Sequence, residues 1–168
     1  MVGIVDTGLM GNLSQSKYLV ATSIATSVVT MIVWSFGFLR MGTVGIVAQA
    51  FGKRDYREIV KTLLRNLILA LIISFFLILS LPLIKILVQN VFRSSDETEV
   101  LINNYLNIRV FSIPAEFLIY ILVGFYLGIQ KTKISSMCII LLSTLNIVFS
   151  SLLVLTLDLN VVGVALGT

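Results

Sequence analysis

The 168-residue sequence contains no histidine and a single cysteine, Cys138. Without histidine there is no His-dependent catalytic triad and no H-E-x-x-H zinc site. One cysteine excludes a disulfide framework, and because Cys138 lies inside an apolar run we expect it to pack as a small hydrophobe. A Walker-type glycine loop with its lysine is also missing. We therefore expect no enzyme, no catalytic residue, no cofactor and no resident metal ion.

Charged residues are scarce: they make up 12% of the chain, against 58% hydrophobic residues. Soluble domains carry about 25% charged and about half apolar residues. This composition excludes an ordinary soluble domain and indicates a membrane protein. The pI of about 9.4 does not indicate nucleic acid as a partner, because the basic residues lie beside the apolar stretches, where anionic lipid and membrane topology explain them. The first sixteen residues lack lysine and arginine, so we expect no cleaved signal peptide.

Three stretches without any charge, 18–39, 66–84 and 134–157, are each near the about 20 residues that cross hydrocarbon as a helix. A fourth stretch, 110–130, carries only Glu116. Shorter apolar ends indicate parts of two more helices. We predict an all-α, polytopic membrane helix bundle with about six spans: 1–13 (partial), 18–39, 60–84, 101–130, 134–157 and 160–168 (partial).

Lysine and arginine gather in two connections between these stretches, "GKRDYREIVK" and "QKTK". The positive-inside rule places both on the cytoplasmic side of a multi-pass protein, which we expect in the inner (plasma) membrane. Four basic residues spaced four apart predict a stripe along one helix, with lipid headgroups as its partners: Lys53, Arg57, Lys61 and Arg65. A docking patch for a soluble partner is the less favoured alternative, because such stripes commonly do no more than fix topology.

Three local patterns bear on the helices themselves. Ser94 precedes Glu97 by three residues, a capping-box pattern that predicts a helix start. Pro114 predicts a bend within the span that follows. Gly124 and Gly128 form a G-x-x-x-G pair, a spacing that lets two helix backbones approach closely in lipid.

Two acids, Asp6 and Glu116, lie inside apolar stretches. An ionised carboxylate in lipid is costly unless it faces water or a partner, so both are functional candidates. With no histidine available, a buried carboxylate is the natural group to exchange a proton near neutrality, and Asp6 could also bind Na⁺. The structural alternative for Asp6 is a hydrogen bond to Thr7, Asn12 or a neighbouring helix. For Glu116 it is an ion pair with Arg109, seven residues earlier, and we favour that reading first.

Two polar stripes lie on otherwise apolar helices. The first consists of Ser136, Ser143, Asn146 and Ser150, and the second of Thr22, Thr26 and Thr30. Serine and asparagine commonly hydrogen-bond between membrane helices, but Asn146 also offers an oxygen to a cation, and both readings stay open. For the threonine stripe, packing is a sufficient explanation.

Four segments together resemble the multidrug and toxic compound extrusion (MATE) family, most closely its DNA-damage-inducible-protein-F-like branch: "GIVDTGLMGNL", "FGFLRMGTVGIVAQAFGKRD", "GFYLGIQKTK" and "LNIVFSSLLVLTLDLNVVGVALGT". The block from Phe36 to Gly52 is the most specific. The resemblance implies two six-helix lobes around a central cavity and an antiporter that exchanges Na⁺ or H⁺ for organic, often cationic, compounds. On this resemblance the chain is most of the amino-terminal lobe, it begins within the family's first helix, and the carboxy-terminal lobe is its missing partner.

The same resemblance assigns roles to individual residues. Asp6 matches the first-helix acid, and Asn146 matches the asparagine one helical turn before a second family acid. Ser150 stands at the position of that second acid, so the site holds one carboxylate instead of two, which lowers its negative charge and its cation affinity. Glu116 is not an acid that the family pattern predicts, and it is a candidate to replace the lost charge.

The leading functional reading is an ion-coupled efflux antiporter, in which protonation or Na⁺ binding at Asp6 shifts the balance between outward-open and inward-open states. We expect the fragment alone to be inactive, because fewer than six helices do not enclose an alternating-access pathway. The alternative is a non-transporting membrane interaction module or a decayed remnant. A lipid-linked precursor flippase is the third reading, but it requires several basic side chains in the cavity, whereas the basic residues here cluster in connections.

Overall fold

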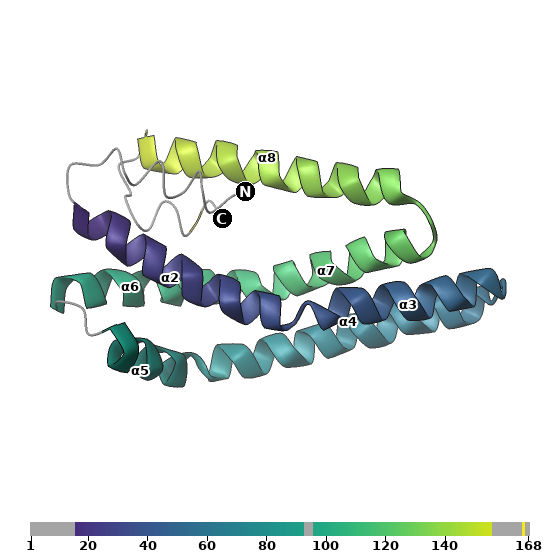
Figure 1. The fold of residues 1–168 in the computed structure, drawn as a ribbon, viewed down its shortest axis with the longest axis horizontal. Coiled ribbons are helices and arrows are strands. Elements are labelled where there is room, and N and C mark those ends of the chain that lie inside the picture. Colours follow the sequence, from purple (N-terminus) through teal and green to yellow (C-terminus); the bar gives the residue numbers. More distant parts are fainter. Residues whose placement is uncertain (1–15, 93–95, 156–165, 167–168) are drawn as a thin grey trace. The chain divides into compact units, whose positions relative to one another are not determined.

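The computed structural model describes residues 16–92, 96–155 and 166, and the regular elements in these residues are helical (Figure 1). They are α2 (Ser16–Ser35), α3 (Phe38–Gly52), α4 (Tyr56–Leu79), α5 (Leu81–Phe92), α6 (Asp96–Arg109), the 3₁₀ turn η1 (Val110–Ser112), α7 (Ile113–Gly128) and α8 (Thr132–Leu155). The all-α prediction is confirmed. The first predicted partial span, 1–13, and all but one residue of the last, 160–168, lie outside the described residues.

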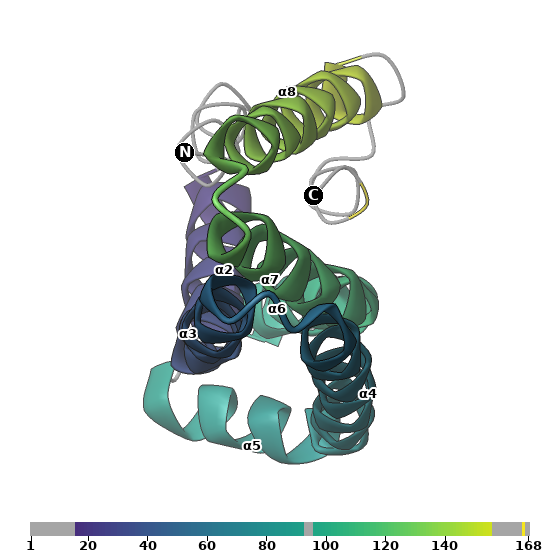
Figure 2. The same ribbon diagram turned by 90° about the vertical axis from the view of Figure 1, so that its right-hand side faces the viewer.

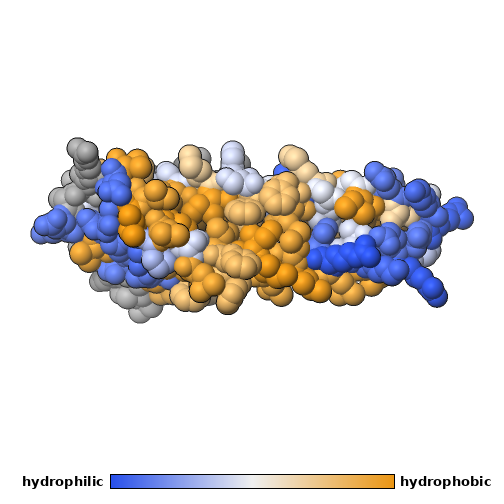
Figure 3. Space-filling model, turned by 90° about the horizontal axis from the view of Figure 1, so that it is seen from below, coloured by the Kyte–Doolittle hydropathy of each residue, from blue (hydrophilic) through white to orange (hydrophobic). Residues whose placement is uncertain are grey.

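In the part of the chain that the structure describes, four helical stretches are long and apolar enough to cross a membrane: Leu19–Gly52, Tyr56–Leu79, Asp96–Gly128 and Thr132–Leu153. In the second of these stretches, apolar side chains are exposed, as is expected of a helix surrounded by lipid: Ile68, Phe75 and Phe76 of α4 are each more than half exposed. On the face drawn in Figure 3, apolar surface covers the middle, and hydrophilic side chains gather at the right-hand end, where the loop between α3 and α4 lies. The chain is a multi-pass membrane protein.

Two predicted spans differ in their bounds from the helices. The stretch 60–84 crosses a break, because α4 ends at Leu79 and α5 begins at Leu81. Pro82 accounts for this break, since it has no N–H and its ring clashes with the carbonyl four residues earlier. The stretch 18–39 is interrupted by a turn at Phe36 and Gly37, and its helix then continues as α3 to Gly52, well beyond the end of the charge-free run.

The helix that contains Pro114 is interrupted as the sequence predicts. The 3₁₀ turn η1 separates α6 from α7 directly before this proline, which is the second residue of α7. Ser94 of the predicted capping box lies outside the described residues. The first turn of α6 carries Asp96, Glu97 and Glu99, and acids at this position interact favourably with the helix dipole.

Two turns of the same kind follow α3 and α7. Arg54 and Gln130 have positive φ values of 56° and 62°, and the N–H groups of Asp55 and Lys131 donate to carbonyls five residues earlier at 2.9 and 2.8 Å. This is the Schellman pattern, which satisfies the last carbonyls of a helix. Both turns lie in the Lys/Arg-rich connections, so each connection reverses the chain within a few residues.

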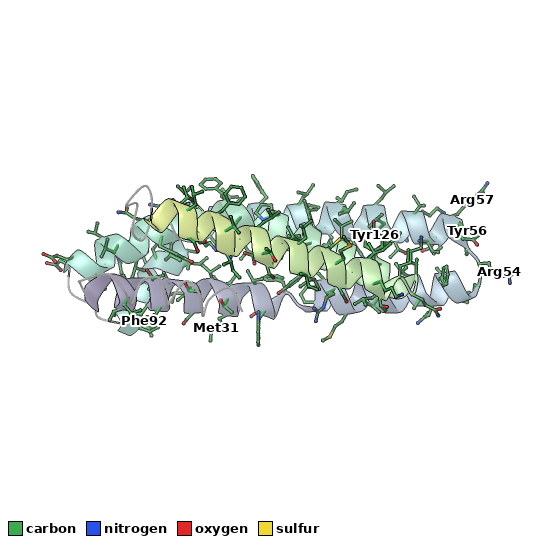
Figure 4. The ribbon with its side chains drawn as sticks, turned by 90° about the horizontal axis from the view of Figure 1, so that it is seen from above. Met31, Arg54, Tyr56, Arg57, Phe92 and Tyr126 are labelled. Carbon is green, nitrogen blue, oxygen red and sulfur yellow. The ribbon has the colours of Figure 1, made fainter. Side chains whose placement is uncertain are left out.

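The predicted basic stripe is shorter than expected. Lys53 is the C-cap of α3 and is separated by the turn from α4, so the stripe on α4 consists of Arg57, Lys61 and Arg65. Arg65 pairs with Glu58 at 3.3 Å. Figure 4 shows Arg57, beside Arg54 and Tyr56, at the outer end of these helices and pointing away from them.

The chain divides into two compact units, of which the second contains residues 32–77 and 113–141. In this second unit α7 lies alongside α3 (Figures 1 and 2). A Cβ atom on Gly124 would stand 2.7 Å from the carbonyl oxygen of Arg40, and one on Gly128 would stand 2.7 Å from Cβ of Val47. The predicted close approach at the G-x-x-x-G pair is therefore confirmed, and α3 is the helix that packs against these two glycines.

The same unit joins α4 to α3 by a polar contact and an apolar one. The side-chain amide of Asn66 donates to the hydroxyl of Thr43 at 2.8 Å, and Thr43 in turn donates to the Leu39 carbonyl at 2.6 Å. Nearer the turn, Val47 and Ile59 belong to one buried cluster. These contacts fix the level at which α3 and α4 stand beside each other.

The first unit draws on residues 1–31, 78–112 and 142–168. Within its described part, α6 contributes the most buried side chains, with Ile102, Tyr105 and Leu106 each at most 2% exposed. Three of the hydrogen bonds in the described part tie other helices to α6: Thr26 of α2 donates to the Tyr105 hydroxyl at 3.1 Å, Lys85 of α5 donates to Asn107 at 2.6 Å, and Gln89 of α5 donates to the Glu99 carboxylate. These contacts place α6 between helices that are far apart in the sequence.

Candidate functional site

The end of α8 holds two of the predicted site residues. Ser150 is 0% exposed and its Oγ has no hydrogen-bond partner among the described residues, and Asn146, one turn earlier, is half-buried. The rest of the predicted stripe is less enclosed, since Ser143 is half-buried and Ser136 is exposed. Of the four residues in the stripe, Ser150 is therefore the one that is fully buried.

The hydroxylated face of α2 contributes a second buried oxygen to the same unit. Thr22 is 1% exposed, and its Oγ1 has no hydrogen-bond partner within residues 16–92 and 96–155. Thr26 uses its hydroxyl to bond Tyr105, whereas Thr30 is exposed. A buried hydroxyl that lacks a partner costs about 1–3 kcal/mol. Thr22 and Ser150 thus leave two oxygens that a water molecule or a cation would stabilise.

Asp6, the first candidate for ion coupling, lies outside the described residues. Glu116 is half-buried in the first turn of α7 and interacts electrostatically with Tyr120, one turn later on the same helix. Arg109, which was predicted as its ion-pair partner, is 9% exposed and donates a hydrogen bond to the Ser112 side chain. The ion pair between Arg109 and Glu116 stays a prediction.

The second unit contains a site that the sequence interpretation missed. A pocket of about 310 Å³ is lined by Trp34, Gly37, Arg40, Met41 and Tyr120. The guanidinium carbon of Arg40 lies 5.9 Å from the centroid of the Tyr120 ring, within the range of a cation–π interaction. Arg40 thus lies within a membrane span, apart from the basic residues that cluster in the connections.

The signal that could have located this site is the isolation of Arg40. It is the only charged residue between Tyr18 and Gly52, and charged residues inside membrane helices are functional candidates by default. The sequence interpretation applied this rule to the two acids only. It used Arg40 as a marker of the family and as the end of a charge-free run.

The two sites offer different chemistry. The oxygens on α2 and α8 suit a hard cation or a water molecule, whereas the guanidinium on α3 suits an anion. Among the described residues, no group of three His, Cys, Asp or Glu side chains could hold a metal ion.

A multi-pass helical protein with small polar sites enclosed by its spans has the architecture of a membrane transporter. Residues 1–152 match the family model described as MatE. The chain belongs to the MatE family.

Its relatives include named transport proteins. The chain is 31% identical over 169 residues to DNA damage-inducible protein F of Escherichia coli (strain K12), covering 100% of this chain and 37% of that protein. It is 29% identical over 177 residues to multidrug export protein MepA of Staphylococcus aureus (strain bovine RF122 / ET3-1), covering 99% of this chain and 37% of that protein. The chain thus spans about 37% of the length of these relatives.

A solved structure supports the fold. The crystal structure of MATE in complex with MaD3S matches with a TM-score of 0.90 at 24% identity, over 99% of this chain and 37% of that chain. The backbone arrangement is therefore that of part of a MATE helix bundle, which confirms the predicted architecture of roughly one lobe.

Proposed function

We propose that this chain works in the export of small organic, mainly cationic, compounds across the plasma membrane, driven by Na⁺ or H⁺ moving inward. Membership of the MatE family and similarity to a protein named as a multidrug export protein support this proposal. The observation that carries it is the pair of buried hydroxyls, Thr22 and Ser150, in the unit that also contains Asn146.

In this proposal Asp6 is the coupling acid, and neutral oxygens complete its site. A single carboxylate carries one negative charge, which one proton or one Na⁺ neutralises. Neutralisation lowers the cost of enclosing the site away from water, so the ion shifts the balance between the outward-open and inward-open states. Asn146 and Ser150 would contribute oxygen ligands to Na⁺, and Thr22 would hold a water molecule or a further ligand.

The first test is gradient-driven efflux from cells that express the complete gene. We expect Asp6→Asn to reduce Na⁺- or H⁺-driven ethidium efflux by at least about tenfold, the scale expected when an essential charged interaction is lost. Asp96→Asn, which removes an exposed acid from the first turn of α6, is the matched control and should leave efflux unchanged. Equal efflux from both variants would remove Asp6 from the mechanism.

Glu116, as the acid that replaces the lost second carboxylate, is tested in the same cells by measuring ion flux driven by added drug. Glu116→Gln should reduce drug-driven ion flux if this role is correct, and undiminished coupling would exclude it. If the unmodified protein shows no gradient-driven efflux at all, the alternative of a membrane interaction module gains support.

A further inference from the structure

Arg40 lies inside its membrane span, twelve residues before the end of α3 at Gly52. The hydrogen bond between Asn66 and Thr43 sets the level of α3 against α4, and Asn66 directly follows Arg65, the last basic residue before the charge-free stretch 66–84. Arg40 is three residues further into the membrane than Thr43, or about 4.5 Å along the helix axis. The guanidinium therefore belongs inside the apolar part of the span, near the edge that carries the basic stripe.

A charge at this depth requires compensation. Among the described residues, the Arg40 guanidinium forms no ion pair and no hydrogen bond, and its recorded partner is the face of the Tyr120 ring. A cation–π contact contributes about 0.5–2 kcal/mol and leaves all five N–H donors of the guanidinium unused. An uncompensated charge inside a membrane span is costly. The site thus favours an anion that accepts from these donors.

The walls of the pocket fit an aromatic body. Trp34 and Met41 are 76% and 70% exposed, and together with Tyr120 they line the pocket around Arg40. Gly37 contributes no side chain, so the pocket reaches the backbone between α2 and α3. Its volume of about 310 Å³ is at the lower end of the range of small-molecule sites.

We propose that this pocket binds a planar aromatic acid, with its carboxylate on Arg40 and its ring against Trp34, Met41 and Tyr120. Arginine presents a flat fork that bonds both oxygens of a carboxylate, which a lysine does not. A lipid phosphate offers the same chemistry to the guanidinium but does not use the aromatic walls, and the lipid arm of the test below distinguishes the two. The proposal does not depend on ion-coupled transport, because binding needs no gradient.

Glu116 is an acid whose charge affects the pocket around Arg40. It interacts electrostatically with Tyr120, but it is not among the residues that line the pocket. Its charge opposes anion binding at short range, so Glu116→Gln should tighten the binding of an aromatic acid. This direction is opposite to the effect that the same change would have on a cation site.

The test uses Trp34 as a built-in reporter, because it is the only tryptophan in the sequence. The full chain in phosphatidylcholine nanodiscs is titrated with three dansyl probes: dansylglycine, which is anionic, dansylamide, which is neutral, and dansylcholine, which is cationic. Energy transfer from Trp34 reports binding. We expect saturable transfer that is at least about tenfold tighter for dansylglycine than for dansylcholine, the scale of a charge-assisted hydrogen bond.

Arg40→Gln should weaken dansylglycine binding by at least about tenfold, and Arg40→Lys should give an intermediate value. Arg57→Gln removes the same charge from the exposed start of α4 and should change nothing. Equal binding of the three probes, or no effect of Arg40→Gln, would overturn the proposal.

Two further measurements cover the cases in which Arg40→Gln does not fold or a lipid occupies the pocket. If Arg40→Gln loses its helical circular dichroism, competition of dansylglycine by unlabelled 1-naphthoate in the unmodified chain decides, and absence of competition counts against the site. Addition of phosphatidylglycerol to the nanodiscs should leave dansylglycine binding unchanged. Displacement by this lipid would show that the pocket takes a lipid phosphate instead.

Discussion

Ser150 combines complete burial with an unpartnered hydroxyl, on a helix whose side chains are otherwise mostly exposed. A buried polar group without a partner is destabilising, so its position argues for a ligand or a water molecule rather than for packing alone. By the family resemblance, an acid would stand at this position. The serine therefore retains an oxygen at the site but removes its charge.

Restoring the charge at this position should strengthen cation binding. We expect Ser150→Asp to shift the Na⁺ concentration that gives half-maximal efflux to values about tenfold lower, because cation affinity rises with the number of charged ligands. Ser136→Asp adds the same charge at an exposed position on α8 and should leave the Na⁺ dependence unchanged. Identical Na⁺ dependence in all three proteins would place the ion elsewhere.

Individual site residues were only partly predictable from sequence. Asn146 and Ser150 were selected by resemblance, and the structure shows that Ser150 is enclosed. Arg40 was not selected, although it is the only charged residue between Tyr18 and Gly52. Its contact with Tyr120, eighty positions further along the chain, is what a sequence pattern does not reveal. The environment of Asp6 falls outside the described residues, so its role stays a prediction.

The α3 and α7 pair depends on two glycines that allow the backbones to meet. A methyl group on Gly124 would meet the Arg40 carbonyl at 2.7 Å, and backbone cannot yield as a flexible side chain can. We therefore expect Gly124→Ala to lower stability by about 1–3 kcal/mol, the usual cost of overpacking. The thermal midpoint of helical circular dichroism, measured on the full chain in detergent, reports this change.

Gly45→Ala is the matched control on α3, because a Cβ atom there would have nothing within 4 Å. This change should be neutral or stabilise the helix by up to about 1 kcal/mol, since alanine is the better helix former. Equal loss of stability in both variants would show that helix propensity, not the α3 and α7 contact, decides the result. An unchanged midpoint in Gly124→Ala would show that the helices can separate at no cost.

For the helices, the sequence predicted those features that depend on local composition, namely where the membrane helices lie and where one of them is interrupted. Apolar runs located the membrane helices because hydrocarbon demands about 20 consecutive apolar residues, and Pro114 marked the interruption at η1. The break at Ser80 was missed, although Pro82 follows it, because the apolar run continues through both. The sequence also did not predict which helix packs against Gly124 and Gly128, because a G-x-x-x-G pair indicates close approach but does not identify the partner helix.

The whole molecule must also adopt one orientation in the membrane. The turns at Arg54 and Gln130 both lie in Lys/Arg-rich connections, and the positive-inside rule places such connections in the cytoplasm. Because α4 is one membrane-crossing helix, the segment after α5 must then lie on the opposite side from Tyr56. This argument uses only the order of the spans along the chain.

Cysteine labelling tests this orientation, since Cys138 is the single cysteine and Cys138→Ser removes the background. In that chain, Tyr56→Cys and Ser94→Cys add one thiol each without changing any charge, so the topology signal itself is preserved. A membrane-impermeant maleimide should label Ser94→Cys in intact cells but should label Tyr56→Cys only after the membrane is permeabilised. The reverse pattern would invert the orientation, and inward movement of the coupling ion past Asp6 would then have to be redrawn. Labelling of both sites in intact cells would show that α4 does not cross the membrane, in conflict with its 24 apolar-rich helical residues.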